Sequence, residues 1–211
     1  MRKGFFITFE GGEGCGKSTH IKALAQYFAD NSIPCICTRE PGGTPLGEKV
    51  RELLLTAKEG NSMDSRTEIL LFEAARAEHV ESLIKPALAE GKIVLCDRFA
   101  DSSSAYQGVA RKLSQSDVSF LNTFAVGGLT PDLTLLFDIP PQIGLERANK
   151  RDAGDSDRMG SQKFSFYEDV RRAFLNLAEK DAQRWRIIDA SGTKEETFEK
   201  VLNAIKEKFN V

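Results

Sequence analysis

The sequence predicts an α/β fold in which helices cover both faces of a doubly wound, five-stranded parallel sheet. Two observations lead to this prediction. Short apolar runs such as Phe5-Phe6-Ile7-Thr8-Phe9 and Ile93-Val94-Leu95-Cys96 alternate along the chain with segments of helical period. The length of 211 residues is sufficient for one domain with its own core. Right-handed crossovers between such strands place helices on both faces of the sheet. We therefore expect a single domain that spans residues 1–211.

Each expected strand is a short apolar or β-branched run that ends at turn-forming or charged residues. Pro41 and two glycines follow the second run, Asp97 ends the third, and Asp138 with two prolines ends the fourth. The strands are expected over residues 5–9, 33–38, 93–97, 133–137 and 185–188.

Apolar residues three and four positions apart define the expected helices, as Ile21, Leu24 and Phe28 do in the first. Pro86 should kink or restart the third helix, and Gly91 should end it. A charged run over residues 149–158 should end the sixth. The helices are expected over residues 18–30, 46–56, 64–90, 100–109, 116–126, 142–148, 166–184 and 194–209.

Composition limits the partners that this chain can have. It is 41% hydrophobic and 28% charged, as in ordinary globular proteins, and its net charge of −2 provides no general attraction for a nucleic acid polymer. No apolar run approaches the roughly 20 residues that span a bilayer. The N-terminus leads directly into the first strand, and the four cysteines form no C-x-x-C pair. We expect a cytoplasmic protein with reduced thiols and no membrane partner.

A glycine-rich run between the first strand and the first helix carries the main functional signal. Residues 11–18 read Gly-Gly-Glu-Gly-Cys-Gly-Lys-Ser and match the template G-x-x-x-x-G-K-[ST] of the phosphate-binding P-loop. Glycines let backbone N–H groups surround an anion, and the helix N-terminus adds partial positive charge. Lys17 is expected to reach the β- and γ-phosphates and Ser18 to hold Mg²⁺. The expected nucleotide-binding residues are Gly11, Gly12, Glu13, Gly14, Cys15, Gly16, Lys17, Ser18 and Thr19.

Asp97 follows four apolar residues at the carboxyl end of the third strand, as a Walker B carboxylate does. Ligands of open parallel sheets collect at this edge. We therefore expect Asp97 to join Ser18 at a metal ion and Arg98 to serve a second ligand. The crevice should lie where residues 11–18, 39–43 and 97–106 converge.

The arginines favour phosphoryl transfer between two nucleotides over a GTPase. Residues 149–152 do spell the guanine-reading motif N-K-x-D, but they follow a helical segment, and the D-x-x-G switch is missing after Asp97. A phosphate acceptor is already anionic at neutral pH, so it needs cations more than a base. Arg39, Arg51 and Arg98 supply such cations, whereas we expect no catalytic role for either histidine.

Four runs together resemble the bacterial thymidylate kinases, and the resemblance covers essentially the whole chain. They are the glycine-rich run with its flanks (residues 9–19), Thr-Arg-Glu-Pro-Gly-Gly (38–43), Asp-Arg-Phe (97–99) with Ala-Tyr-Gln-Gly (105–108), and Pro-Asp-Leu-Thr (131–134). The resemblance implies a P-loop NTPase sandwich with a short lid at about residues 147–160. It implies the reaction ATP + dTMP → ADP + dTDP with Mg²⁺, in dTTP biosynthesis. It also implies a homodimer, for which the apolar face of residues 64–89 is a candidate.

The resemblance assigns roles to single residues. Phe72 would stack on thymine, with Arg76 one turn along bonding a base carbonyl; the pattern alone would make them a core aromatic and a surface charge. Ser103 would read the other polar edge of the base. Glu13 would lie near the sugar 3′-hydroxyl and Tyr106 beside the sugar. Arg98, with Arg39 and Arg51, would hold the dTMP phosphate, and Lys17 and Arg98 would take part in catalysis. The catalytic lid arginine would be Arg147, Arg151 or Arg158, of which Arg158 fits best.

Two alternatives to this function remain open at the level of the sequence. A deoxynucleoside kinase would need a general base near the acceptor hydroxyl, for which Glu10 or Glu13 is available. A regulatory nucleotide-binding protein would bind ATP without turnover.

Overall fold

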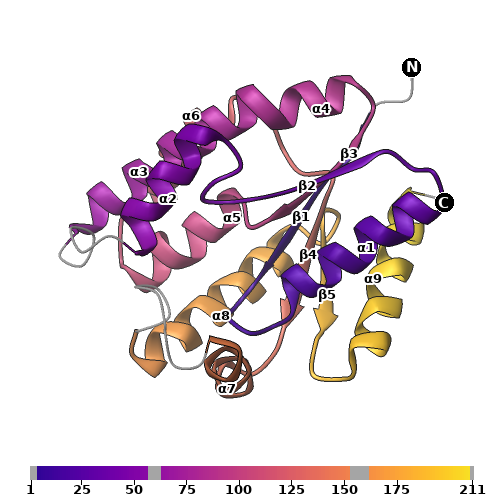
Figure 1. Cartoon of the computed structure of the whole chain (residues 1–211). Coiled ribbons are helices and arrows are strands. Elements are labelled where there is room, and N and C mark those ends of the chain that lie inside the picture. Colours follow the sequence, from indigo (N-terminus) through magenta and orange to yellow (C-terminus); the bar gives the residue numbers. More distant parts are fainter. Residues whose placement is uncertain (1–3, 57–62, 153–161, 210–211) are drawn as a thin grey trace.

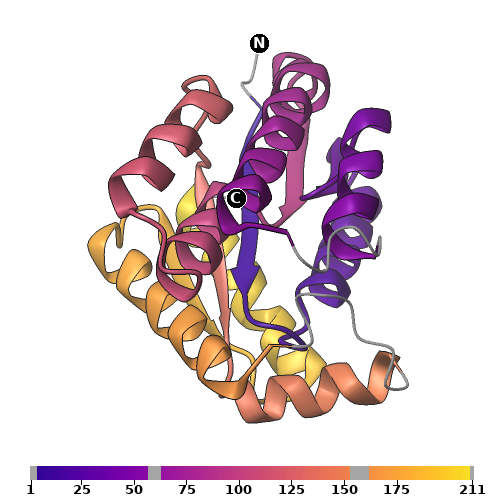
Figure 2. The ribbon, with the colours of Figure 1, turned by 90° about the vertical axis from the view of Figure 1, so that its left-hand side faces the viewer.

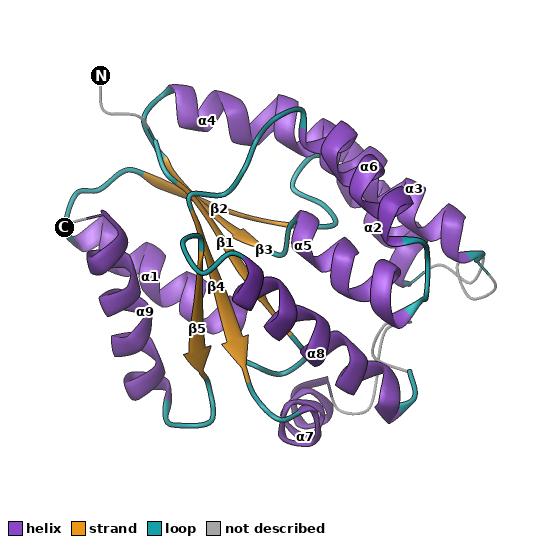
Figure 3. Cartoon of the chain, turned by 180° about the vertical axis from the view of Figure 1, so that it is seen from behind, coloured by secondary structure: helices purple, strands orange, loops and turns teal. Residues whose placement is uncertain are grey.

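A five-stranded parallel sheet forms the centre of the fold. The computed structural model describes residues 4–56, 63–152 and 162–209 of the 211-residue chain (Figure 1). Helices α1 and α9 cover one face of the sheet, and α4, α5 and α8 cover the other (Figures 1 and 3). The three-layer α/β/α architecture predicted from the sequence is therefore confirmed.

The strands lie in the order β2-β3-β1-β4-β5 and all run parallel. The chain first builds the sheet to one side of β1 and then, from β4 on, to the other side. The order of connections thus reverses at β1, and such a reversal opens a crevice at the carboxyl edge. The strands are β1 (Phe6–Gly11), β2 (Cys35–Arg39), β3 (Ile93–Asp97), β4 (Leu133–Asp138) and β5 (Trp185–Asp189).

The register of the three strands on one side of the sheet aligns their exits. Asp97 pairs with Arg39 of β2 and with Phe9 of β1. Glu40 and Arg98 therefore leave the sheet at the level of Glu10 in β1, which is where the crevice was expected.

Within the described ranges, the helices follow the predicted order, and two of the segments are π-helical. They are α1 (Lys17–Asp30), α2 (Pro45–Leu55), α3 (Ser65–His79), the π-helix η2 (Val80–Ile84), α4 (Lys85–Ala89), α5 (Ala100–Ser103), the π-helix η3 (Ser104–Ala110), α6 (Gln115–Val126), α7 (Pro141–Asp152), α8 (Phe164–Lys180) and α9 (Lys194–Phe209).

Apolar side chains from both helical layers fill the space against the sheet. Leu24 and Phe28 of α1 lie in one cluster with Ile205 of α9, and Phe174 of α8 packs in a second cluster on the other face with Leu136. These side chains are almost fully buried. Burial of each contributes roughly 1.5–3 kcal/mol, so the two clusters hold the sheet rigid beneath the loops.

Most predicted boundaries shift by one or two residues, and the helix expected over residues 100–109 consists of α5 and the π-helix η3. Three further differences have a physical reason. The helix expected over residues 142–148 continues to Asp152, because the run after Ala148 contains good helix formers and Gly154 is its first strong helix breaker. The helix expected to reach residue 184 ends at Lys180, and Arg184 closes a turn onto the carbonyl oxygen of Asp181 (3.0 Å). The expected restart at Pro86 takes the form of the π-helix η2, which directly precedes α4.

Two further findings concern the chain as a whole. All four cysteines are free, as expected. None of the helices in the described ranges combines the length and the apolar character that crossing a bilayer requires.

Candidate active site

A cavity of about 450 Å³ opens at the carboxyl edge of the sheet. The loops after β1, β2 and β3 line it together with α2, α3 and η3, which confirms the position predicted for the crevice. The sequence-predicted residues that line it are Glu13, Gly14, Cys15, Gly16, Lys17, Ser18, Thr19, Arg39, Arg51, Phe72, Arg76, Asp97, Arg98, Ser103 and Tyr106. Gly11 and Gly12 form the base of the glycine-rich loop beside it.

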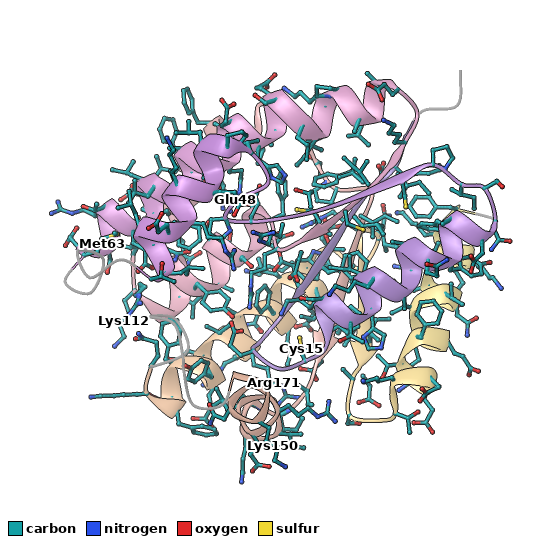
Figure 4. The ribbon with its side chains drawn as sticks, in the orientation of Figure 1. Cys15, Glu48, Met63, Lys112, Lys150 and Arg171 are labelled. Atoms are coloured by element: carbon teal, nitrogen blue, oxygen red, sulfur yellow. The ribbon has the colours of Figure 1, made fainter. Side chains whose placement is uncertain are left out.

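The glycine-rich loop has the backbone that its sequence requires. Gly11, Gly14 and Gly16 have φ values of 136°, 65° and 93°, a region that side chains other than glycine disfavour. Nζ of Lys17 lies inside the loop and donates hydrogen bonds to the carbonyl oxygens of Gly11 (3.1 Å) and Gly12 (2.9 Å). The ammonium group is thus held where an anion in the loop would meet it (Cys15 marks the loop in Figure 4).

Helix α7 forms the floor of this loop. A Cβ atom added at Gly14 would overlap with the carbonyl oxygen of Gly144 in α7, and one at Gly144 would overlap with the carbonyl oxygen of Glu13. Figures 1 and 2 show α7 lying across the end of the molecule beneath the loop. Two glycines therefore let the loop and the helix touch through their backbones.

The two predicted metal ligands meet at the start of α1. The hydroxyl of Ser18 donates a hydrogen bond of 2.7 Å to Oδ2 of Asp97. A hydroxyl and a carboxylate at hydrogen-bond distance, beside a phosphate loop, are the oxygen ligands that Mg²⁺ accepts in such sites. The residues present therefore fit this ion.

Arg98 lies between the loop after β1 and η3. Its Nη2 donates to Oε1 of Glu13 (2.7 Å), its Nη1 donates to Oγ of Ser102 (3.3 Å), and its guanidinium lies over the ring of Tyr106, 4.9 Å from the centroid. Burial alone would lower the pKa of Arg98, but Tyr106, Glu13 and Asp97 raise it above its ordinary value. The guanidinium is a permanently charged group fixed at the cavity wall.

Tyr106 is buried on the same wall and is tied to the same carboxylate. Its hydroxyl donates to Oε1 of Glu13 (3.3 Å), and its ring packs edge-on against Phe166 and Phe174. Burial raises the pKa of the phenol, so it remains a neutral donor. The ring is therefore held as a rigid plate.

Arg76 is only 1% exposed. The interpretation of Arg76 as a surface charge, which the sequence pattern alone favours, is therefore wrong. Its guanidinium donates hydrogen bonds to Oε2 of Glu40 (2.8 Å), Oε1 of Glu73, Oγ of Ser103 and Oδ1 of Asn122 (3.0 Å each), and the carbonyl oxygen of Phe99 (3.3 Å). Burial opposes the charge, but Glu40 and Glu73 outweigh it and raise the pKa of Arg76. Phe72 lines the cavity one helical turn away.

Sequence reasoning missed the carboxylates and the histidine that surround Arg76. Glu40 also accepts a hydrogen bond from Nδ1 of His79 (2.9 Å), whose Nε2 lies 2.6 Å from Oγ1 of Thr38. His79 is fully buried and lines no part of the cavity, so its role is structural. The sequence does contain a signal for part of this cluster: Glu73, Arg76 and His79 are spaced at intervals of three, which puts them on one helix face.

The remaining predicted cations lie at different distances from the cavity. Arg39 pairs with Glu48 of α2 (2.8 Å), and Nη1 of Arg51 donates to the carbonyl oxygen of Pro41 (2.8 Å); both arginines line the cavity. Arg147 instead donates to the carbonyl oxygens of Ala190 (3.0 Å) and Ser191 (3.3 Å), in the loop between β5 and α9.

Two other lid positions are not placed. The side chain of Arg151 and all of Arg158 lie outside the described residues. Residues 149–152, which spell N-K-x-D, form the last turn of α7. This confirms that the motif lies in a helix and does not directly follow a strand.

Comparison with known proteins gives a consistent answer. The family model described as thymidylate kinase matches residues 9–201. The thymidylate kinase of Protochlamydia amoebophila (strain UWE25) is 46% identical over 213 residues, which cover 99% of this chain and 95% of that protein. The thymidylate kinase of Clostridium novyi (strain NT) is 43% identical, and the match covers 98% and 100% of the two chains.

A solved structure agrees in fold as well as in sequence. The crystal structure of thymidylate kinase from Ehrlichia chaffeensis superimposes with a TM-score of 0.76 at 34% identity, covering 97% of this chain and 99% of that one. Both the fold and the sequence along nearly its whole length therefore show that this chain belongs to the thymidylate kinase family.

Proposed function

We propose that this enzyme transfers the γ-phosphoryl group of ATP, bound as its Mg²⁺ complex, to the 5′-phosphate of dTMP, giving ADP and dTDP for dTTP biosynthesis. One observation carries the proposal. The residues that would hold a donor phosphate, the metal ion and an acceptor phosphate all line a single cavity: Lys17 with the glycine-rich loop, Ser18 with Asp97, and Arg98. A donor phosphate in the loop and an acceptor phosphate at Arg98 would therefore lie in the same cavity.

The chain's own residues supply charge neutralisation and alignment. Lys17 would hold the β- and γ-phosphates, and Arg98 with Arg39 and Arg51 would hold the acceptor phosphate. Ser18 and Asp97 would hold Mg²⁺, which when bound neutralises charge on the phosphates. An acceptor phosphate, whose second pKa is about 6, needs no general base at neutral pH.

We propose that the thymidine nucleoside of the acceptor is held by other residues of the same cavity lining. Phe72 would stack on the base, and Arg76 and Ser103 would bond its polar edge. Glu13 would meet the sugar 3′-hydroxyl, and the ring of Tyr106 would fill the space beside the 2′ position. Among the lid arginines we propose Arg158 or Arg151, rather than Arg147, as the one that meets the transferred group, because Arg147 already donates to two backbone carbonyls.

A direct test is to detect the product. Incubation with ATP, MgCl₂ and dTMP should give dTDP and ADP in equal amounts by anion-exchange chromatography. Chelation of the metal should stop the formation of both. ADP without dTDP would mean hydrolysis in place of transfer, and no ADP at all would support a regulatory binding protein.

We also propose that two copies pair through the face that α3 and α6 share. These helices pack against each other and leave Leu70, Phe120 and Phe124 at 54%, 70% and 79% exposed. Apolar groups so exposed on adjoining helices mark an interaction surface, and the family resemblance implies a second copy as its occupant. Sedimentation should show a dimer for the wild type and a shift toward monomer for Phe124→Asp. A wild-type monomer at micromolar concentration would contradict the proposal.

A further inference from the structure

Glu10 is a buried carboxylate to which the chemistry above gives no task. It lies at the end of β1, is fully buried, and does not line the cavity. Its side chain reaches across to the turn that follows β3. Oε1 accepts a hydrogen bond from the backbone N–H of Phe99 (2.8 Å), and Oε2 accepts one from the hydroxyl of Ser102 (2.6 Å).

These two contacts cap the N-terminus of α5, and the capping residue comes from β1. Phe99 is the N-cap of α5, and its side chain offers no capping oxygen. In a capping box, a glutamate three residues into the helix accepts the N–H of the N-cap residue. Here Ser102 occupies that third position and Glu10 supplies the carboxylate from β1. The strand therefore fixes how α5 begins.

The residue just before this cap is Arg98, whose backbone needs support. Its φ of 69° lies in the left-handed region, which is unfavourable for a residue with a side chain and persists only where its surroundings enforce it. The N–H of Phe99, fixed by Glu10, follows directly. The cap thus holds the strained conformation that turns Arg98 toward the cavity.

The side chain of Arg98 is connected to the same carboxylate. Nη1 of Arg98 donates to Oγ of Ser102 (3.3 Å), and Ser102 in turn donates to Glu10 (2.6 Å). A planar guanidinium bonds a phosphate well only at a fixed orientation. Glu10 therefore acts on both the backbone and the guanidinium of Arg98.

We infer that Glu10 is a positioning residue that sets the geometry of Arg98 for the acceptor phosphate. The inference rests on the proposed function, because that function places the acceptor phosphate at Arg98. Burial raises the pKa of Glu10 to about 7, Asp101 adds to the rise, and Arg98 and the two hydrogen bonds oppose it. A carboxyl group can keep both partners in either state, since the protonated form donates to Ser102.

The test measures the KM of each substrate separately in variants of Glu10. Glu10→Ala should raise the KM for dTMP roughly tenfold to a hundredfold, the value of one charge-assisted hydrogen bond, with a much smaller change in the KM for ATP. Glu10→Gln keeps an acceptor for Phe99 and a partner for Ser102, so it should restore most of the wild-type KM. In the Arg98→Ala background, Glu10→Ala should add little, because its effect passes through Arg98.

A matched control comes from the same strand. Thr8 lies two residues earlier on the same side of β1, is fully buried, and hydrogen-bonds Thr134 (2.8 Å). Thr8→Val removes a buried hydrogen bond without touching the turn, so the KM for dTMP should stay at the wild-type value.

The outcomes separate the two claims. A wild type that makes no dTDP contradicts the proposed function. An active wild type with an unchanged KM for dTMP in folded Glu10→Ala overturns the positioning role alone, as does an equal rise in both KM values. If Glu10→Ala does not fold, Ser102→Ala tests the same link, and an unchanged KM for dTMP in that variant overturns the inference.

Discussion

At the scale of single residues, the site depends on charges whose positions are fixed before any ligand arrives. Arg98 is held by Glu13 and Ser102, and Arg76 is held by two buried carboxylates. Preorganised charges of this kind stabilise a transition state without the cost of reorienting during the reaction.

Lys17 is the residue whose removal should affect transfer most directly. Lys17→Ala removes the ammonium group that the loop carbonyls hold, so kcat should fall by at least about 10². The fold should survive, because the backbone of the loop depends on its glycines. Steady-state kinetics and circular dichroism measure the two effects. Lys206→Ala, at an exposed position of α9, should match the wild type. Near-normal turnover of Lys17→Ala would contradict the role proposed for the loop.

Tyr106 should govern the choice of sugar. Tyr106→Ala should narrow the gap in kcat/KM between dTMP and its ribose counterpart, because it opens space beside the 2′ position. Tyr106→Phe keeps the ring and loses the hydroxyl that bonds Glu13, so it should preserve the discrimination. An equal loss with both substrates in Tyr106→Ala would make the tyrosine a part of the scaffold only.

The sequence predicts some of these residues better than others, for a physical reason. Lys17, Ser18 and Asp97 lie in local motifs, where the neighbouring residues define the role. The burial of Arg76 depends on Glu40 and Asn122, which come from a loop and a helix far along the chain. No local pattern contains that information.

At the scale of elements, α7 lies directly against the glycine-rich loop. Its Gly144 contacts the backbone of the loop, and its last turn, up to Asp152, belongs to the segment that we expect to act as a lid. Because the loop and the helix are in backbone contact, a shift of α7 must be felt at the phosphate site.

The lid arginines should affect catalysis more than binding. An arginine that stabilises transition-state charge contributes about 10³–10⁵ in rate in related reactions. We expect Arg158→Ala or Arg151→Ala to lower kcat far more than it raises either KM, and Arg147→Ala to have the smaller effect on kcat. Lys150→Ala, on the same helix, serves as the control in the same assay. A wild-type kcat in all three arginine variants would show that these lid arginines take no part in catalysis.

At the scale of the whole molecule, we expect the free energy of unfolding to depend on pH through Glu10. The pKa of Glu10 is raised from 4.5 to about 7 by burial and by Asp101. Between these values the unfolded chain releases the proton while the folded chain keeps it, so the free energy of unfolding falls as pH rises. The full contribution is about 3 kcal/mol, from 1.36 kcal/mol per pKa unit.

Urea unfolding of the wild type and of Glu10→Gln at pH 5 and pH 8 measures this contribution. The stability of the wild type relative to Glu10→Gln should fall between the two pH values, because only the wild type titrates at this position. The same difference at both pH values would show that Glu10 titrates alike in the folded and unfolded chains.

The layered sheet could be predicted because its strands are apolar runs set between helical segments. The ends of α7 and α8 could not, because charged residues continue a helix as readily as they form a loop. Tertiary contacts such as that of Arg184 with Asp101 (2.6 Å) fix where each segment turns.

The central claim is that the acceptor is the phosphate of a thymidine nucleotide, and one substrate comparison tests it most directly. ADP release from Mg-ATP should be measured with dTMP, dUMP, dCMP, AMP and thymidine under identical conditions. We predict the highest kcat/KM with dTMP and no release above background with thymidine, because thymidine lacks the anionic phosphate that Arg98 and its neighbours would hold. Release with thymidine at a rate equal to or above that with dTMP would contradict the account.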